Sequence, residues 1–405
     1  MRGPLPAAVT DGRAASWIAA VILLAFPTVG MLAKHGMSTL GIALAVLLGA
    51  LLLLDRRLPW PGWALVAPVA ALLAVQALDL LVAPSCPPCA DRWPQAAGAA
   101  VLLLPLAAGG MVGAARLDRA LVRRALVAGV LIGALVALVE LGLDAPIYRL
   151  LNGRDPGEAV SLSRYNRGIV ALVLLALVAG GVLWGEGRRV WAVALLAAVG
   201  AVSMLGISLI AHLCLLLGLV TLVAGAVAER LVRVAMVVVV AVQMLSAPWA
   251  ANAVYDWVIT DNVAISDLAI RHRLELWDHG GALARERPWT GWGLDAFDHR
   301  PIDPERLAKA QRMTKPEPHP HNAGLQLWVE TGVVGVLLGI AFLAAVAWRI
   351  GRLPRALRPW ATALLAVGLL PGLVSFGLWQ TTYLAMAAVA AFAVGLLRDK
   401  DSRAE

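Results

Sequence analysis

The sequence predicts an all-α integral membrane protein with about twelve transmembrane helices and one large outer loop between helices nine and ten. Of its 405 residues, 60% are hydrophobic and 15% are charged, whereas soluble domains are near 45–50% apolar and about 25% charged. A soluble fold of this length could not bury so much apolar surface, so lipid must surround much of the chain. The apolar residues form solid blocks of about 16–24, which suits helices crossing a bilayer. A β-barrel would show alternation instead.

Twelve apolar blocks, separated by charged residues or by Pro and Gly, mark the predicted spans. They lie at 17–33, 39–54, 63–83, 96–114, 121–143, 168–185, 190–206, 208–227, 232–250, 324–348, 359–377 and 379–397. The first block lacks a small-residue cleavage site, so we expect a retained helix. The chain therefore divides into helices one to nine (1–250), the long loop (251–323), and helices ten to twelve with a tail (324–405).

The positions of Lys and Arg orient the spans. Nineteen of the 34 positive residues fall in segments that would share one side of the membrane with both termini. The positive-inside rule makes that side cytoplasmic, which places the long loop outside. The net charge of +8 raises nucleic-acid binding as an alternative. The basic residues do not cluster as a soluble binding face requires, so we expect no nucleic-acid partner.

Positive charge on the outer side gathers in two loops, against this trend. Four arginines lie in the 144–167 connection, among them Arg164 and Arg167, and nine Lys and Arg residues lie in 251–323. Ordinary solvated loop charge is one interpretation. We favour an anion site, because guanidinium groups match phosphate geometry.

Cys86 and Cys89 form a Cys-Pro-Pro-Cys segment in the outer 84–95 loop. A thioredoxin-like redox role needs a βαβ context, which the sequence lacks. A metal site would need two more ligands nearby. A local disulfide or two free thiols are the interpretations left, and we assign the pair no catalytic role.

The long loop has the amino-acid composition of a soluble protein. Its residues 270–284 predict an amphipathic helix. Trp277 lies on the apolar face as an interfacial anchor or a substrate contact, and the polar face carries Arg271, Arg273, Glu275 and Asp278. The Pro-Trp-Thr-Gly-Trp-Gly segment at 288–293 ends the helix, and its glycines permit a tight turn and close approach to a ligand.

Five of the seven histidines lie in this loop: His272, His279, His299, His319 and His321. Histidine can act as a general base near neutral pH when a neighbouring group fixes its tautomer. The last two directly precede the span that begins at Gly324, so they should lie at the membrane surface. Structural and metal-binding roles are alternatives. Pro320 constrains a metal site and no carboxylate set accompanies the pair, so we expect catalysis or substrate binding without metal or cofactor.

Three segments, in order, resemble a known family. They are Arg273-Leu-Glu-Leu-Trp277, the Pro-Trp-Thr-Gly-Trp-Gly segment, and His321-Asn322 running into Glu330-Thr-Gly332. With the twelve-span layout they are similar to the O-antigen ligase superfamily, which also contains O-antigen polymerases and bacterial protein O-oligosaccharyltransferases. The resemblance, closest to O-antigen ligase, implies a metal-independent glycosyltransferase of the inner membrane. Such an enzyme moves a glycan from undecaprenyl diphosphate to lipid A–core on the periplasmic face.

The resemblance also implies residue roles. His321 corresponds to the base that takes the acceptor proton, and Arg273 to a contact of the diphosphate, with Arg271 assisting. His319 is a second candidate base or an orienting neighbour. Asn322 and Trp277 belong to the same motifs and are further candidate substrate-binding residues.

One departure and two alternatives accompany this interpretation. Family members often carry Ser-Arg between spans seven and eight, whereas this chain has Ser208-Leu209, so either another arginine fills the role or the alignment of this hairpin is off. His212, one turn on, could face the site or be structural. A polymerase shares the donor chemistry and differs in acceptor. A transporter is disfavoured because the spans carry few charges, Asp79 and Glu140 excepted, and the halves show no repeat.

Overall fold

A computed structural model describes residues 12–54, 63–82, 117–155, 157–260, 268–310, 313 and 317–397. Every regular element in these ranges is a helix, so the all-α prediction is confirmed for them. Six helices are long and apolar enough to cross a membrane, and they span Arg13–Leu32, Arg119–Gly142, Leu162–Gly185, Leu209–Val258, Ala323–Ile350 and Arg355–Val374. Four shorter apolar helices accompany them, at Gly36–Leu51, Trp63–Asp79, Arg189–Ser203 and Thr381–Leu397.

The apolar helices follow the predicted blocks. They are α2 (Arg13–Leu32), α3 (Gly36–Leu54), α4 (Trp63–Val82), α6 (Arg119–Gly142), α8 (Asn166–Gly185), α9 (Arg189–Ser203), α10 (Leu209–Thr260), α13 (Ala323–Ile350), α14 (Arg358–Val374) and α15 (Thr381–Val394). Each covers one predicted block, except that α10 covers both 208–227 and 232–250. The predicted block at 96–114, together with Cys86 and Cys89, lies outside the described residues.

The chain reverses direction within α10, at Ala228, whose backbone is not helical (φ −135°, ψ 52°). The first segment of α10 runs to the start of α14, where Gly225 lies against Pro359. The second segment leaves from the same place, with Glu229 4.0 Å from Arg358. It then runs past the start of α13, where the carbonyl of Met244 accepts the indole N–H of Trp328 at 2.7 Å. The two segments are therefore antiparallel, as two separate spans require.

Two hydrophobic clusters hold the bundle together. In the first, α8 is buried along most of its length because α2, α6, α9, α14 and α15 pack around it. The second joins α4, the second segment of α10, α11 (Leu268–Glu286) and α13. Outward positions are apolar as well, and Val223, Val227 and Leu231 of α10 are 68%, 88% and 69% exposed. Apolar surface of this extent is rare in water-soluble monomers, so lipid is its expected environment.

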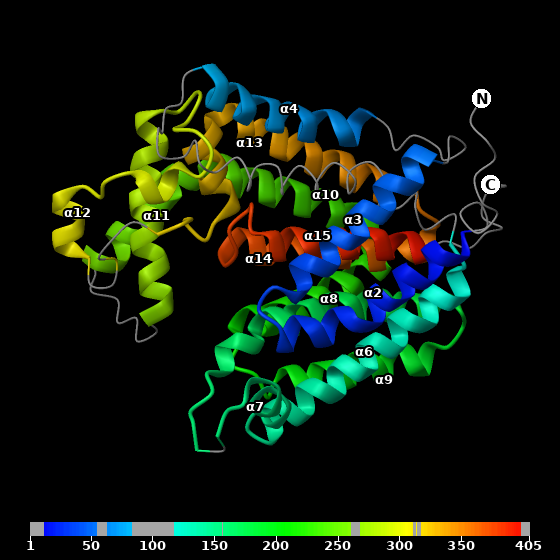
Figure 1. The fold of residues 1–405 in the computed structure, drawn as a ribbon. Coiled ribbons are helices and arrows are strands. Elements are labelled where there is room, and N and C mark those ends of the chain that lie inside the picture. The colour runs from blue at the N-terminus through cyan, green and yellow to red at the C-terminus, as the bar shows by residue number, and fades with distance from the viewer. Residues whose placement is uncertain are drawn as a thin grey trace, which may run out of the picture.

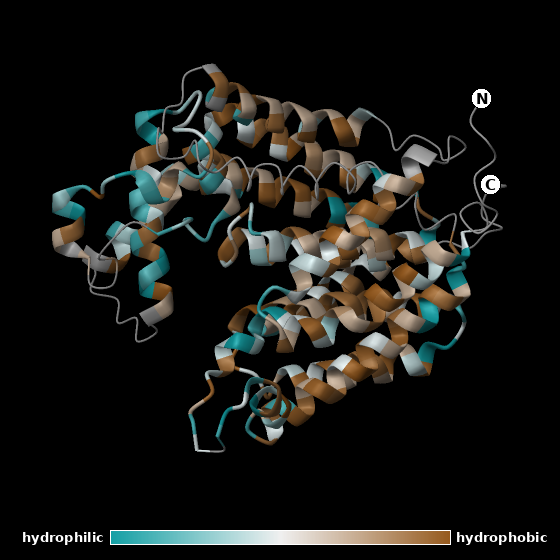
Figure 2. Ribbon diagram, in the orientation of Figure 1, coloured by the Kyte–Doolittle hydropathy of each residue, from teal (hydrophilic) through white to brown (hydrophobic). Residues whose placement is uncertain are grey.

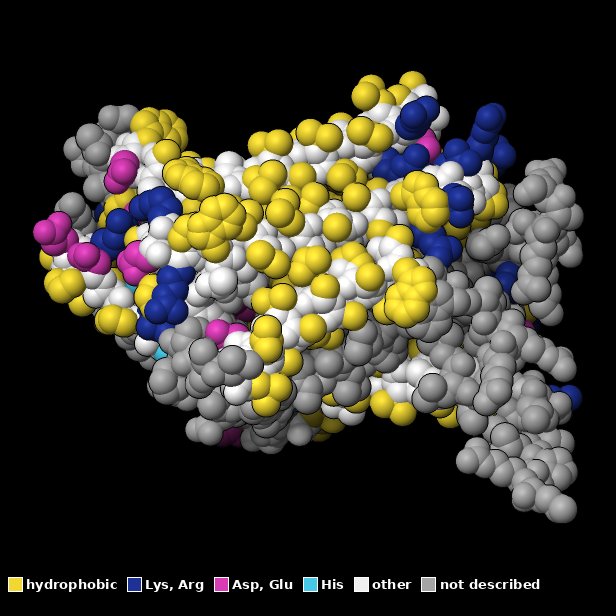
Figure 3. Space-filling model, turned by 90° about the horizontal axis from the view of Figure 1, so that it is seen from above, with side chains coloured by type: hydrophobic (Ala, Val, Ile, Leu, Met, Phe, Trp, Pro, Cys, Tyr) yellow, Lys and Arg dark blue, Asp and Glu magenta, His cyan; other side chains and the backbone are white. Residues whose placement is uncertain are grey.

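The short helices α7 (Pro146–Asn152) and α12 (Pro304–Lys309) lie with α11 at one end of the bundle (Figure 1). The other short elements are η3 (Leu162–Tyr165), η4 (Ala296–His299), η5 (Arg355–Leu357) and η6 (Gly395–Leu397), of which η5 and η6 adjoin α14 and α15. Figure 2 shows hydrophilic residues on α11 and α12 and hydrophobic residues along the long helices. In Figure 3, hydrophobic side chains cover the middle of the face and charged ones lie at its two ends. The two cationic loops thus share one end of the molecule.

Candidate functional site

The helix predicted over 270–284 is confirmed by α11, but its buried face differs from the predicted one. Glu275 and Asp278, expected on the polar face, are 2% and 4% exposed. The reason is that α11 packs against both α10 and α13. Glu275 accepts a hydrogen bond from the Met313 N–H at 2.7 Å and lies 3.5 Å from Arg271. Buried carboxylates persist only with such partners.

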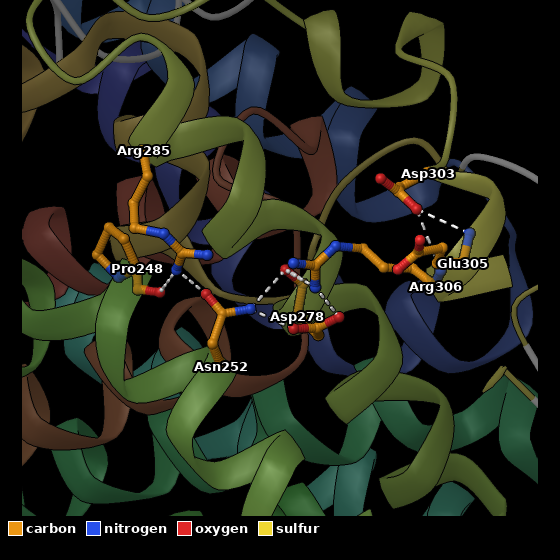
Figure 4. Close-up of polar contacts among 7 residues, drawn as sticks. All are labelled: Pro248, Asn252, Asp278, Arg285, Asp303, Glu305 and Arg306. Carbon is orange, nitrogen blue, oxygen red and sulfur yellow. Dashed lines mark hydrogen bonds and ion pairs between the residues drawn. The ribbon is translucent and has the colours of Figure 1, made fainter.

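A polar network ties α11 to its neighbours (Figure 4). The carboxylate of Asp278 accepts hydrogen bonds from Asn252 of α10 and Arg306 of α12. Arg285 donates to the amide oxygen of Asn252 and, at 2.8 Å, to the carbonyl of Pro248. Since the donors come from two other helices, the network fixes the position of α11, which carries the candidate arginines.

The Pro-Trp-Thr-Gly-Trp-Gly segment packs backbone to backbone against α13. The N–H groups of Trp292 and Gly293 donate to the carbonyls of Val329 and Glu330, at 2.7 and 3.0 Å. These carbonyls are released from the helix ladder because α13 kinks at Gly332 (φ 62°, ψ −158°). The glycines of this segment therefore serve close approach to α13, where the sequence analysis expected a ligand.

His319 and His321 lie together just before α13, with ring centroids 4.3 Å apart. Nδ1 of His321 donates to the carbonyl of Ser375, and no described residue forms a hydrogen bond with its Nε2. Both ring nitrogens of His319 are engaged: Nδ1 accepts the His321 N–H at 3.3 Å, and Nε2 lies 2.7 Å from the Gln380 amide nitrogen. Of the two histidines, His321 is the one with a ring nitrogen placed to take a proton.

The surroundings keep both histidines neutral. Burial lowers the pKa of His321, the hydrogen bond to Ser375 partly offsets this, and the positive charge of Arg273 lowers it further. Burial lowers the pKa of His319 to about 3, and the neighbouring His321 ring and the positive charge of Arg167 disfavour its protonation further. Arg273 from the long loop and Arg167 from the 144–167 connection are therefore close enough to act on the same pair of rings.

His321 also has a left-handed backbone, with φ 55°. That conformation costs a residue with a Cβ about 1–2 kcal/mol. Residues held in such conformations concentrate at functional sites, where the surrounding structure imposes them. The hydrogen bond from His321 to the Ser375 carbonyl is one of the contacts that fixes this conformation.

The two candidate arginines of the 144–167 connection, Arg164 and Arg167, have different surroundings. The guanidinium of Arg164 stacks on Tyr148, 3.3 Å from the ring centroid, and the adjacent Tyr165 donates to the buried carboxylate of Glu140. Arg167, in the first turn of α8, is exposed and forms no hydrogen bond or ion pair with the described residues. The positive end of the helix dipole disfavours a cation there, so an anion nearby would stabilise Arg167.

The other three predicted residues have roles in the fold. Asn322 is the N-cap of α13, and its Oδ1 accepts the Leu325 N–H at 3.0 Å. Arg271 pairs with the buried Glu275. Trp277 packs against the second hydrophobic cluster, and its buried Nε1 has no hydrogen-bond partner among the described residues.

The residues that hold the histidine pair were missed by the sequence analysis. Ser375, Gly377 and Gln380 belong to the α14–α15 loop (residues 375–380), and Ser375 lies 54 positions after His321. A Cβ at Gly377 would lie 2.6 Å from Cδ2 of His319. The only signal in the sequence was a polar interruption, Gln380-Thr-Thr, between two apolar blocks.

The turn between α9 and α10 holds no arginine. Leu209, where the resemblance expects one, begins α10 and is 49% exposed. Nε2 of His212 lies 2.9 Å from the carbonyl of Ser203 at the end of α9. Of the two roles considered for His212, the structural one matches this contact.

The fold and the site together define a class of protein: an all-helical chain with several potential membrane spans, carrying a neutral histidine and two arginines at one end. No group of three or more His, Cys, Asp or Glu side chains is placed to hold a metal ion in the part of the chain that the structure describes. Residues 204–340 match the O-antigen ligase family, so the chain carries a domain of that family. No curated protein matches the chain.

The matched stretch contains α10, α11, α12 and the kink of α13, and with them Arg273 and His321. It excludes Arg167 and the α14–α15 loop. A domain of this family implies an enzyme that transfers glycans, of the ligase or polymerase type, and that acts on lipid-linked glycans.

Proposed function

We propose that this protein is an O-antigen ligase of the bacterial inner membrane. It would transfer a glycan from undecaprenyl diphosphate to lipid A–core on the periplasmic face. The observation that carries the proposal is the neutral His321, whose Nε2 has no partner among the described residues, with Arg273 and Arg167 acting on the same histidine pair. Transfer from a diphosphate carrier needs a base for the acceptor hydroxyl and cations for the leaving group.

In the proposed reaction, Nε2 of His321 takes the proton of the acceptor hydroxyl. The acceptor oxygen bonds to the anomeric carbon of the glycan while the bond from that carbon to the diphosphate oxygen breaks. Negative charge then grows on the diphosphate, where Arg273 and Arg167 stabilise it, and the proton later leaves His321 for water. His319, with both ring nitrogens engaged, orients its neighbour. Arg164, Arg271, Asn322 and Trp277 are proposed to support substrate binding around this centre.

The proposed topology has about twelve spans, with both termini cytoplasmic and residues 251–323 as the periplasmic catalytic loop between helices nine and ten. The antiparallel segments of α10 support its assignment as helices eight and nine. The gathering of α7, α11 and α12 at one end of the bundle supports placing both cationic loops on one side (Figure 1). The helical start of the loop, up to Thr260, continues α10.

A transfer assay tests the proposal with purified full-length protein in detergent and a glycan linked to undecaprenyl diphosphate. Lipid A–core is present in one arm and absent in the other, and both arms contain EDTA because no metal step is proposed. Product that requires lipid A–core establishes the ligase. Longer carrier-linked glycan without lipid A–core would establish a polymerase, and no product in either arm would favour a transporter.

Arg273→Ala is expected to lower kcat/KM about 100-fold, as loss of one group that stabilises transition-state charge typically does. Arg273→Lys should keep part of the rate, because it retains the charge but loses the two-pronged geometry of guanidinium. Arg154→Ala is the matched control, since Arg154 is an exposed arginine of the other outer loop that pairs with Glu158 at 2.7 Å. Equal, mild losses in both Arg273 variants would assign this residue a structural role.

The transfer rate is expected to fall at acid pH only. Burial holds the pKa of His321 below its ordinary value of 6.5, so the base is neutral and competent throughout the neutral range. As pH falls through this lowered pKa the imidazole becomes protonated and cannot accept the hydroxyl proton. The measurement is kcat/KM for the donor against pH, and an acid limb centred at or above 6.5 would contradict the assignment.

A further inference from the structure

The α14–α15 loop touches both histidines of the site. The carbonyl of Ser375 accepts the hydrogen of His321 Nδ1. Gly377 lies against the ring of His319, and the side-chain amide of Gln380 contacts Nε2 of that ring at 2.7 Å. Because a carbonyl can only accept a hydrogen bond, Nδ1 of the neutral His321 must carry the proton, and the lone pair is left on Nε2.

Two buried side chains of α13 hold this loop in place. Oε1 of Gln326 accepts the Leu378 N–H at 2.8 Å. Glu330 accepts the indole N–H of Trp379 on one carboxylate oxygen and the Gln326 amide, at 2.8 Å, on the other. Gln326, Glu330 and Trp379 are 2%, 2% and 3% exposed. Buried polar side chains are costly without partners. The partners of Gln326 and Glu330 include Leu378 and Trp379 of the loop, and Glu330 also accepts a hydrogen bond from the Asp295 backbone.

The backbone of Glu330 is fixed in turn from the opposite side. Its carbonyl accepts the Gly293 N–H at 3.0 Å, next to the bond from Trp292 to Val329. A chain of direct contacts therefore runs from the Pro-Trp-Thr-Gly-Trp-Gly segment through Glu330 to the α14–α15 loop and on to His321.

We propose that Glu330 and Gln326 are positioning residues, which hold the α14–α15 loop so that the Ser375 carbonyl keeps the Nε2 lone pair of His321 available as the base. Neither residue touches the reacting atoms in this proposal. The inference rests on the proposed function, since it assigns these residues an effect on that same base. Glu330, the buried glutamate of the Glu-Thr-Gly motif, would then contribute to catalysis as well as to packing.

Glu330→Gln tests the proposal with little change in volume. The glutamine has one acceptor oxygen in place of two, so at least one of its donors, which include Gln326 and Trp379, loses its partner. We expect kcat to fall about 10–100-fold, the range typical for outer partners that orient a functional histidine. The donor KM should change by less than about twofold, because no substrate contact is removed. Trp379→Phe removes the indole N–H that donates to Glu330, so it should also lower kcat.

The pH profile separates positioning from a loss of folded protein. The Ser375 carbonyl raises the pKa of His321, while Arg273, His272 and Glu317 also act on it from their own positions. Loss of the Ser375 hydrogen bond while the ring stays buried removes this upward effect, so the acid limb should move to lower pH in Glu330→Gln. Partial unfolding would reduce the amplitude and leave the limb in place.

Hydrogen exchange provides a readout that does not depend on catalysis. In wild-type protein the Leu378 amide is bonded to Gln326, so peptides covering 375–380 should exchange faster in Glu330→Gln. Thr362→Val is the matched control, because Thr362 of α14 is fully buried and its hydroxyl has no partner among the described residues. This variant should keep the wild-type kcat, acid limb and exchange.

The outcomes separate the two proposals. If wild-type protein transfers no glycan, the proposed function fails, and exchange of the loop still decides whether Glu330 holds it. If wild-type protein is active, a Glu330→Gln variant with normal kcat overturns the positioning role. A lower kcat with an unmoved acid limb and unchanged loop exchange overturns it as well, since the effect would then be general destabilisation.

Discussion

His321→Ala is expected to reduce glycan transfer about 10²- to 10⁴-fold, the usual contribution of a positioned general base. The reason is that Nε2 of this ring is the one nitrogen of the histidine pair that the contacts leave open, while both nitrogens of His319 are engaged. Substrate binding should change little, because the arginines remain. The measurement is the transfer assay under saturating donor, with each variant matched for folded protein by size-exclusion chromatography.

Two further variants sharpen this test. His321→Asn removes the imidazole but retains a residue that tolerates the left-handed backbone, so it separates loss of the base from loss of the local conformation. His35→Ala is the control, because His35 is an exposed histidine in the turn between α2 and α3. Transfer at the wild-type rate by both His321 variants would remove this residue from the mechanism.

The helices could be predicted from the sequence because each depends on a local property. An apolar block long enough to cross a bilayer is helical wherever it lies, since its backbone must satisfy its own hydrogen bonds in lipid. The reversal at Ala228 could also be predicted, because the charged residues between Glu229 and Arg233 separate two apolar blocks and mark the turn. The bounds of α11 also followed from the sequence, since an amphipathic run ends at Pro288.

The faces of α11 could not be predicted in the same way. Glu275 and Asp278 are charged, and hydrophobic periodicity therefore assigns them to solvent. Their burial depends on donors that come from elsewhere, namely Asn252, Arg306 and the Met313 backbone. A local pattern contains no information about such partners, so tertiary pairing reversed the expectation.

The candidate site also has a part that local sequence predicts and a part that depends on tertiary contacts. His321, Arg273 and Arg167 could be named from the sequence, and in the structure the positive charges of Arg273 and Arg167 lower the pKa values of His321 and His319. The choice between His319 and His321 could not be made from the sequence, because it depends on which ring nitrogens are occupied. The occupants, Ser375 and Gln380, come from the α14–α15 loop, where no motif directs attention and the family match does not reach.

Gly332→Ala is the second variant for which a large effect is expected: it should destabilise the protein by at least about 3 kcal/mol. The backbone of Gly332 (φ 62°, ψ −158°) lies in a region essentially restricted to glycine, and a residue with a Cβ there costs about 1–3 kcal/mol in strain. The new Cβ would also overlap the carbonyl of Trp289, a backbone group that cannot rotate away. The measurement is the thermal midpoint in detergent together with the fraction of monodisperse protein.

Gly368→Ala provides the comparison, because Gly368 lies inside α14 and a Cβ there meets nothing within 4 Å. Alanine is favoured over glycine in a helix by about 1 kcal/mol, so this variant should be neutral or slightly more stable.

A small effect at Gly332 would mean that the segment at 288–293 can separate from α13 at little cost. The hydrogen bonds from Trp292 and Gly293 would then not fix Glu330, and the chain of contacts to His321 would lose its first link. A large effect at Gly332 with none at Gly368 ties the kink of α13 to the close backbone packing that the glycines allow.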